Sequence, residues 1–337
     1  MKNTVFLIVL LPFTHVFGQN NIALNDIYFT RQPSPISESL GKGGVALFGN
    51  KNFWFYNPAL LGTIDRISIS GALIDPGFYG INGQYNSFSL AVPFSTRFGI
   101  GFGRFFLDWQ HGSYSVNYAI SASYQPLSGL YVGGSMNYVR DYWTSSFEAQ
   151  SFPLDLGIAK FWRFSTPSAN HTFIAAVSYR NVFEAQLRYP KNNAIILDSL
   201  PLSFQTTFDL PTIQNFGVSY VLTTNKTLLD LTALSWLAMI DLTNVKNTKY
   251  YGGYHIGSEL TAMEILAIRC GYYREKNYKS KYEKGPTYGL GIQVPIYKIT
   301  ENRVPLLVSM SHTRFSWGGD NSRKLTAWSL SIDWNRR

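Results

Sequence analysis

The stretch SYSVNYAISASYQ, residues 113–125, consists of two interleaved sets of side chains. The even positions hold tyrosine, valine, isoleucine and alanine, whereas the odd positions hold only serine, asparagine, alanine and glutamine. Alternation with a period of two residues is typical of a β-strand, because successive side chains point to opposite faces. The stretch therefore predicts a strand with one apolar face and one small, polar face. What the apolar face contacts decides the fold.

The same alternation recurs along the chain, and we expect fourteen strands in total. They are expected at residues 66–74, 86–94, 97–105, 113–125, 130–140, 151–161, 171–181, 215–223, 234–241, 250–260, 265–273, 287–297, 304–315 and 326–334. Residues 202–209 are a candidate for a fifteenth strand, but a single-chain bacterial barrel with both termini on one side needs an even number. We therefore assign them to an outer loop at 182–213. This assignment also places the short turns at 93–96, 125–129 and 260–264 together on the periplasmic side.

The residue types on the two faces distinguish a membrane barrel from a soluble β-sandwich. In a sandwich, the face opposite the core would carry many lysine, glutamate, threonine and aspartate residues. Here that face is mostly glycine, serine, alanine and asparagine, and charged residues make up 15% of the chain against about 25% in soluble domains. Aromatic residues reach 16% and gather at strand ends, as at 272–273, Trp328 and Trp334, where a membrane interface would lie. The pattern favours an all-β, transmembrane antiparallel barrel of about 14 strands over the sandwich.

The N-terminus has the pattern of a secretory signal peptide. Lys2 gives a positive start, residues 5–13 (VFLIVLLPF) form an apolar core, and Gly18 is a small residue ahead of a cut before Gln19. A transmembrane anchor is the alternative, but the apolar run is shorter than the roughly 18 residues that span a bilayer. We expect residues 1–18 to be cleaved and the mature chain to reside in a bacterial outer membrane.

Cysteine content and charge exclude other classes of protein. Cys270 is the one cysteine, so an intramolecular disulfide and a cysteine metal cluster are excluded. The net charge of +9 is spread over strands and loops without a long basic tract, and an exported chain would not normally meet nucleic acid. We expect no nucleic-acid partner, no metal and no cofactor.

The segment before the first strand, residues 37–62 (SESLGKGGVALFGNKNFWFYNPALLG), differs in kind from the rest. Its candidate plug motif comprises Gly41, Gly43, Gly44, Asn57, Pro58 and Ala59. The glycines allow close backbone approach and positive φ angles, and the Asn-Pro pair is a turn signature. A phosphate-binding loop is the alternative, but GKGG follows no strand and lacks GxxxxGK[ST] spacing. Because the residues between the motifs are strongly apolar, we expect 19–62 to plug the periplasmic end of a barrel formed by 63–337.

Several of these motifs resemble a known family. LGKGGVA (40–46) and YNPALL (56–61), followed by many amphipathic strands, resemble outer-membrane barrels of the PorV/PorQ group, part of the FadL-like superfamily. HIGSEL…LAIRCGYYRE (255–275) and GPTYGLGIQVP (285–295) resemble later strands of that group. The chain departs from the pattern at Lys42, where methionine is common, at Leu260, where an aromatic residue is usual, and in lacking a final phenylalanine. These departures leave the branch of the superfamily open.

The resemblance implies a FadL-like barrel that takes part in type IX protein secretion. There, PorV-like barrels bind secreted cargo and PorQ-like barrels belong to the surface attachment complex. FadL itself carries hydrophobic molecules through its lumen, which gives the alternative function of a passive transporter. The leading expectation is a non-enzymatic secretion component that binds cargo or an attachment-complex partner. Its other expected partners are outer-membrane lipid and lipopolysaccharide.

Two sets of ionisable residues are candidates for function. The expected luminal polar cluster comprises His255, Glu259 and Arg269. Its simplest interpretation is a salt-bridge and hydrogen-bond cluster, because an unpaired charge there would be costly. A catalytic or proton-relay role is the alternative, but GxSxG, HExxH and any interpretable nucleophile–base spacing are missing from the sequence. We therefore predict that the chain is not an enzyme.

The second set lies in YREKNYKSKYEKG, residues 273–285, an expected outer loop. Its basic residues are Arg274, Lys276, Lys279, Lys281 and Lys284. A solvated loop balanced against anionic lipopolysaccharide is one interpretation, and a docking surface for an acidic partner is the other.

Overall fold

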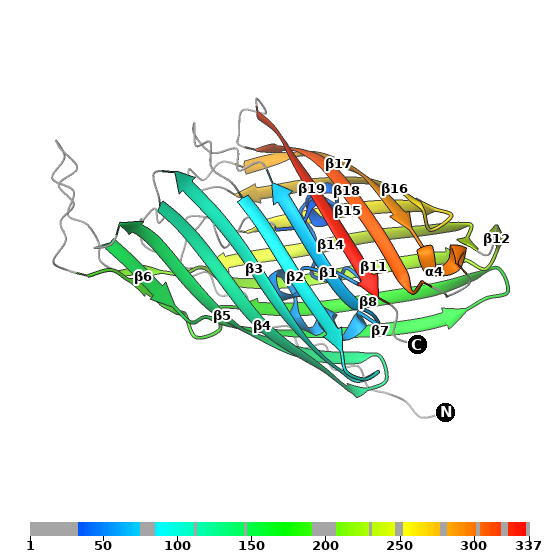
Figure 1. Cartoon of the computed structure of the whole chain (residues 1–337), viewed down its shortest axis with the longest axis horizontal. Helices are drawn as coiled ribbons and strands as arrows, with labels where there is room; N and C mark the ends of the chain where they lie inside the picture. The colour runs from blue at the N-terminus through cyan, green and yellow to red at the C-terminus, as the bar shows by residue number, and fades with distance from the viewer. Residues whose placement is uncertain are drawn as a thin grey trace.

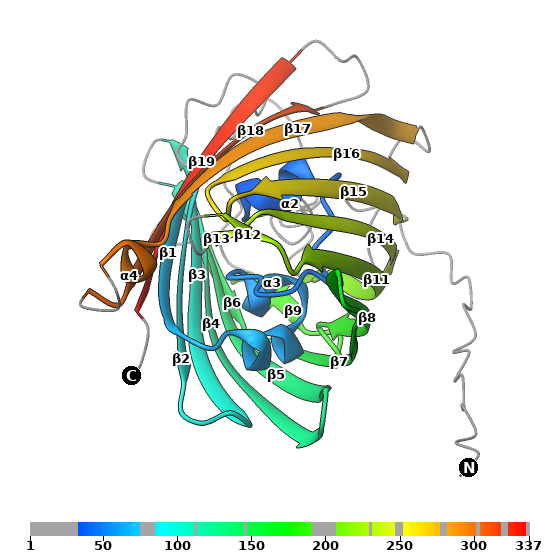
Figure 2. The same ribbon diagram turned by 90° about the vertical axis from the view of Figure 1, so that its right-hand side faces the viewer.

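A computed structural model of the chain describes residues 33–74, 85–110, 113–144, 147–190, 207–228, 231–246, 252–276, 282–300, 304–317 and 323–334. Within these ranges, fourteen strand positions form an antiparallel sheet that closes on itself (Figures 1 and 2). The wall strands are β1 (Ile67–Ile74), β2 (Tyr85–Pro93), β3 (Phe98–Gln110), β4 (Ser113–Leu127), β5 (Leu130–Thr144), β7 (Leu154–Ser165), β8 (Ala169–Arg180), β11 (Thr212–Thr224), β14 (Leu234–Lys246), β15 (Gly253–Ala262), β16 (Leu266–Lys276), β17 (Tyr282–Val294), β18 (Leu306–Trp317) and β19 (Arg323–Trp334). The first and last strands pair along their length, from Ile67 opposite Trp334 to Ile74 opposite Ala327. The predicted barrel is confirmed.

The stretch at 113–125 shows which face is which. Ile120 is 69% exposed and its neighbours of the same parity, Tyr118 and Tyr124, are also exposed. Ala119 and Ser121 are buried, as are Ser115, Asn117 and Ser123 of the same parity. An exposed apolar face around a closed barrel is the arrangement that lipid requires. The apolar side chains therefore face outward and the small ones face the lumen.

The connections at the two ends of the barrel differ in length. The turns between β2 and β3, β4 and β5, and β15 and β16 lie at the same end as the start of β1 and the end of β19. The segment between β8 and β11 lies at the opposite end. In it, β10 (Thr207–Asp209) pairs with β9 (Gln186–Arg188) in a separate two-stranded sheet. Residues 207–209 are thus no barrel strand, as expected from parity, and the short turns mark the periplasmic end.

The sixth wall position departs from the prediction of one strand at 151–161. Here β6 (Phe147–Ser151) pairs with the outer half of β5 and β7 pairs with its other half. The break falls at Pro153, which has no backbone N–H to donate to a ladder. The Asn137 backbone N–H still donates to the Pro153 carbonyl oxygen at 2.9 Å, and the Asn137 side-chain amide reaches the same oxygen at 3.3 Å. The wall therefore remains hydrogen-bonded across the break.

The described helices are short. Within the lumen lie α2 (Pro35–Ser39), α3 (Phe53–Tyr56) and the 3₁₀ helix η1 (Pro58–Thr63), and Figure 2 shows α2 and α3 enclosed by the wall. The helix α4 (Ile296–Ile299) contacts β18 at the periplasmic end. A small hairpin of β12 (Thr227–Leu228) and β13 (Leu231–Thr232) also lies at that end. None of the described helices is long and apolar enough to cross a membrane.

Glu264 joins three connections at the periplasmic rim. It lies in the β15–β16 turn, where Met263 and Glu264 have φ angles of 53° and 54°, the left-handed conformation of a tight hairpin turn. Its carboxylate accepts hydrogen bonds from the Thr232 backbone N–H at 3.0 Å and hydroxyl at 2.6 Å. The Lys298 ammonium of α4 donates to it at 2.8 Å. One carboxylate thus holds the β12–β13 hairpin and α4 against the turn.

We expect Glu264→Gln to lower the melting temperature at neutral pH but not at strongly acidic pH. Burial alone would raise the pKa of Glu264, but hydrogen bonds from Lys298 and Thr232 outweigh it and hold this pKa below its usual value. A carboxyl with a depressed folded-state pKa stabilises above its unfolded pKa and loses that contribution as pH falls through the folded pKa. The difference at neutral pH should be about 1 kcal/mol or less. Circular-dichroism melts in detergent, with Asp65→Asn as an exposed rim control, measure it; equal melts at neutral pH would contradict the assignment.

Candidate functional site

Residues 33–66 lie in the lumen, and we call this segment the plug. The plug starts at α2 against β16–β19 and ends with η1 against β4, β5 and β7. The Ser34 hydroxyl oxygen caps α2 by accepting from the Ser37 N–H at 3.3 Å, and Pro35 is its first residue, a position where proline is tolerated because no N–H is needed. Residues 19–32 of the predicted plug lie outside the described residues. The described part of the plug therefore runs across the lumen, from β16–β19 to β4, β5 and β7.

The glycine motif forms a turn that is bonded to the three strands β15, β16 and β17. Gly41 and Lys42 have φ angles of 71° and 68°. The Gly41 N–H donates to the Thr287 hydroxyl at 3.0 Å, and the His255 Nδ1–H donates to the Gly41 carbonyl oxygen at 2.8 Å. Lys42 forms a 2.7 Å ion pair with Glu275, and its ammonium lies 3.8 Å from the centre of the Tyr273 ring. We call this set of contacts the latch.

The next two residues of the motif are anchored by Asp241 on the inward face of β14. Its Oδ2 accepts from the Gly44 N–H at 2.6 Å and from the Val45 N–H at 2.9 Å. The Asp241 side chain is 1% exposed, so both bonds are shielded from water. A buried carboxylate that accepts from two backbone N–H groups is a strong, specific tie between plug and wall.

The Asn57-Pro58-Ala59 motif ties the plug to β8 and β7, which lie two and three strands along the sheet from β14. The Asn57 side-chain oxygen accepts from the Ala59 N–H at 3.0 Å and so caps η1, whose first residue is Pro58. The Asn57 amide group donates at 3.3 Å to the carbonyl oxygens of Ile158 on β7 and Val177 on β8. One side chain therefore both starts the helix and ties it to two strands.

Glycines on the inward face of the wall make room for the plug. A Cβ atom at Gly103 would lie 2.1 Å from the Trp54 ring, and one at Gly133 would lie 2.5 Å from the Pro58 backbone. At Gly271 it would lie 2.1 Å from the Gly41 nitrogen. Any larger residue would collide, so the small inward face is complementary to the plug rather than to water.

The predicted luminal polar cluster is divided in the structure. Arg269 is hydrogen-bonded to Glu259 on the neighbouring strand, and its guanidinium also donates to the Ser311 hydroxyl at 3.2 Å. His255 instead belongs to the latch, where its Nε2 lies 3.7 Å from a Glu275 oxygen. Among the described residues, histidine, cysteine and acidic side chains form no group of three that could hold a metal ion.

The predicted basic outer loop is shorter than expected. The ladder between β16 and β17 continues to Lys276 and resumes at Tyr282, so Arg274, Lys276 and Lys284 lie on strands. The physical reason is that the charged side chains alternate between the faces of the hairpin, as strand residues do. Lys279 and Lys281 lie outside the described residues.

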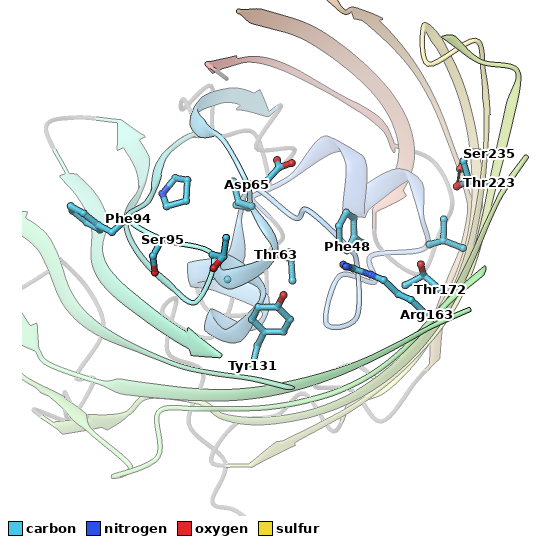
Figure 3. Close-up of a pocket in the computed structure, with 15 residues that line it drawn as sticks. Phe48, Thr63, Asp65, Phe94, Ser95, Tyr131, Arg163, Thr172, Thr223 and Ser235 are labelled. Atoms are coloured by element: carbon cyan, nitrogen blue, oxygen red, sulfur yellow. Dashed lines mark hydrogen bonds between the residues drawn. The ribbon is translucent and has the colours of Figure 1, made fainter. Parts of the chain in front are cut away.

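A cavity of about 750 Å³ lies between the plug and the wall at the periplasmic end (Figure 3). Apolar and aromatic groups line one part of it: Phe48 and Ile64 of the plug, Phe94, Tyr131 and Val221. Hydroxyl groups on adjacent strands line another part: Thr172, Thr223 and Ser235. Arg163 of β7 lies beside Phe48 (Figure 3), with its guanidinium 5.7 Å from the ring centre. The volume is in the range of small-molecule sites.

Solved structures of other proteins share the fold of this chain. The P. putida toluene transporter TodX matches with a TM-score of 0.50 and 10% identity over 90% of this chain and 98% of that chain. The fold is FadL-like. The Ralstonia pickettii toluene transporter TbuX (TM-score 0.48, 12% identity, 90% and 97% covered) and a Pseudomonas aeruginosa FadL homologue (0.47, 12%, 89% and 98%) are further neighbours. No protein-family model and no curated protein matches the chain.

The exposed apolar wall of the closed barrel indicates an outer-membrane location. The likeness extends to fold alone at these identities, so the secretion role implied by the PorV/PorQ resemblance stays a prediction. The expected signal peptide, residues 1–18, lies outside the described residues.

Sequence reasoning missed three wall residues that contact the plug or line the cavity. Asp241 and Glu275 hold the plug, and Arg163 lines the cavity. Each is an ionisable residue on the inward-facing parity of its strand. A search for such isolated inward charges would have found all three.

Proposed function

We propose that the chain is a passive outer-membrane channel for hydrophobic small molecules, in which the plug controls passage. The observation that carries the proposal is the partly open cavity of about 750 Å³ between plug and wall. Its aromatic and aliphatic lining suits an apolar molecule, and its row of hydroxyls beside Arg163 suits one polar group on that molecule. The FadL-like fold supports a channel or transporter role better than it supports a protein-binding role in secretion.

Passage through the barrel requires part of the plug to move. At mid-height, the plug side chains Phe53, Trp54 and Leu60 are completely buried against the wall. The latch and the Asp241 anchor hold the segment that separates this core from β14–β17. The structure therefore corresponds to the closed state of the proposed channel.

Uptake by cells that lack other carriers for hydrophobic compounds tests the proposal. Cells producing the protein should accumulate labelled toluene several times faster than cells without it, because lipopolysaccharide makes the outer leaflet a barrier to such molecules. Thr223→Trp fills the cavity and should abolish most of the gain. Thr326→Trp, which adds the same side chain to an exposed outward position, is the matched control. Equal uptake with and without the protein, or full uptake by Thr223→Trp, would refute the proposal.

A further inference from the structure

At the outer end of the β16–β17 hairpin, the basic and the acidic residues lie on opposite faces of the sheet. Arg274 and Lys284 are direct cross-strand partners, and Glu275 and Glu283 form the next pair. Inward-facing Tyr273, which is 1% exposed, fixes the parity of β16. The basic pair therefore faces outward and the acidic pair faces the lumen.

The two pairs differ in how their like charges are compensated. Glu275 is neutralised by Lys42 of the plug at 2.7 Å, with His255 nearby. For Arg274, the described residues offer only the Tyr282 ring, 4.0 Å from its guanidinium carbon, and its Nε has no hydrogen-bond partner. No described acidic side chain pairs with Lys284. The connecting residues 277–281 contain two lysines and no acid.

Like charges directly opposite each other on a sheet face are destabilising. The cost is removed if an anion from outside the protein bridges the two side chains. A guanidinium fork beside an ammonium suits phosphate in particular, because the fork donates two parallel hydrogen bonds and the ammonium adds a second charge.

The height of the pair on the wall indicates where this anion comes from. Below Lys284 on the same face of β17 follow Tyr288, Leu290, Ile292 and Val294, which are between 40% and 59% exposed. Ten residues of a strand tilted as in such barrels rise about 26 Å, close to the height of the apolar band. Lys284 thus lies just above the aromatic and aliphatic band, at the level of the lipid headgroups in the outer leaflet.

We propose that the outward face of the β16–β17 hairpin binds the phosphate of a phosphorylated outer-leaflet glycolipid through Arg274 and Lys284. The lipid's acyl chains lie along the exposed aliphatic residues of β17, and Tyr282 supports the guanidinium from above. The site is independent of the cavity and of the proposed transport.

Native mass spectrometry of the purified barrel with diphosphorylated lipid A tests the proposal. The double variant Arg274→Gln/Lys284→Gln should bind lipid A about tenfold more weakly or worse. Arg140→Gln is the matched control: it removes another outward arginine, one that already has a 2.6 Å partner in Glu148. Heat-modifiable migration on gels verifies that each variant is folded.

The remaining arms separate the possible sources of the anion. Dephosphorylated lipid A should bind the wild type as weakly as lipid A binds the double variant, and inorganic phosphate at the same concentration should not compete. Complete competition by inorganic phosphate, or equal lipid binding by wild type and double variant, would overturn the proposal.

Discussion

Gly271→Ala is expected to displace the plug from the barrel wall. The added Cβ would lie 2.1 Å from the Gly41 nitrogen and 2.4 Å from the Leu40 carbonyl carbon, so the collision is with backbone rather than with a flexible side chain. The Gly41 turn cannot easily retreat, because its N–H and carbonyl oxygen are bonded to Thr287 and His255 at 3.0 and 2.8 Å. Overpacking of this kind costs about 1–3 kcal/mol and sometimes more. We expect faster proteolytic cleavage within the plug and a lower melting temperature in detergent.

Gly134→Ala provides the control for this prediction. Gly134 lies on β5 facing outward, and its nearest neighbours to an added Cβ are at an ordinary 3.6 Å. Loss of glycine's backbone freedom alone would tend to stabilise the strand. Gly134→Ala should therefore leave plug cleavage unchanged. If the two variants were cleaved at the same rate, the complementarity of plug and inward glycines would be wrong.

The barrel was predictable from sequence because its determinants are local. Parity along 113–125 already separates lipid-facing from luminal residues, and an even strand number excluded 202–209 from the wall. The Pro153 break was harder to see, because residues on both sides of it keep the same alternation. A proline inside a period-two segment signals such an interruption.

The contacts between plug and wall were only half predictable, because the residues that meet are far apart in sequence. The glycine and Asn-Pro motifs were visible, but Gly44 and Asp241 are 197 positions apart and Lys42 and Glu275 are 233 apart. The odd or even position of a residue along a strand gives the face on which its side chain lies, but not the plug atom that it contacts. His255 and Glu259 share a face, yet they are four strand positions and about 13 Å apart, and only His255 contacts the plug. Sequence alone could not divide that cluster.

Asp241→Ala is expected to release the plug while leaving the barrel wall intact. The substitution leaves the Gly44 and Val45 N–H groups without the acceptor that they reach at 2.6 and 2.9 Å. A buried donor without a partner costs about 1–3 kcal/mol, and here two are created in one segment. Asp241→Asn keeps one acceptor oxygen and should have an intermediate effect. Hydrogen exchange of the plug amides, read by mass spectrometry, should rise sharply for Asp241→Ala.

Glu259→Ala separates loss of the plug anchor from general damage to the barrel. Glu259 is also inward-facing, but its bonds are to Arg269 and Thr261 of the wall. Its removal leaves a buried arginine unpaired and should cost the barrel about 3–5 kcal/mol without raising exchange in the plug. If the plug controls passage, Asp241→Ala should in addition speed toluene uptake, whereas Glu259→Ala should not. Exchange in the plug that rises equally in both variants would show that Asp241 acts only through barrel stability.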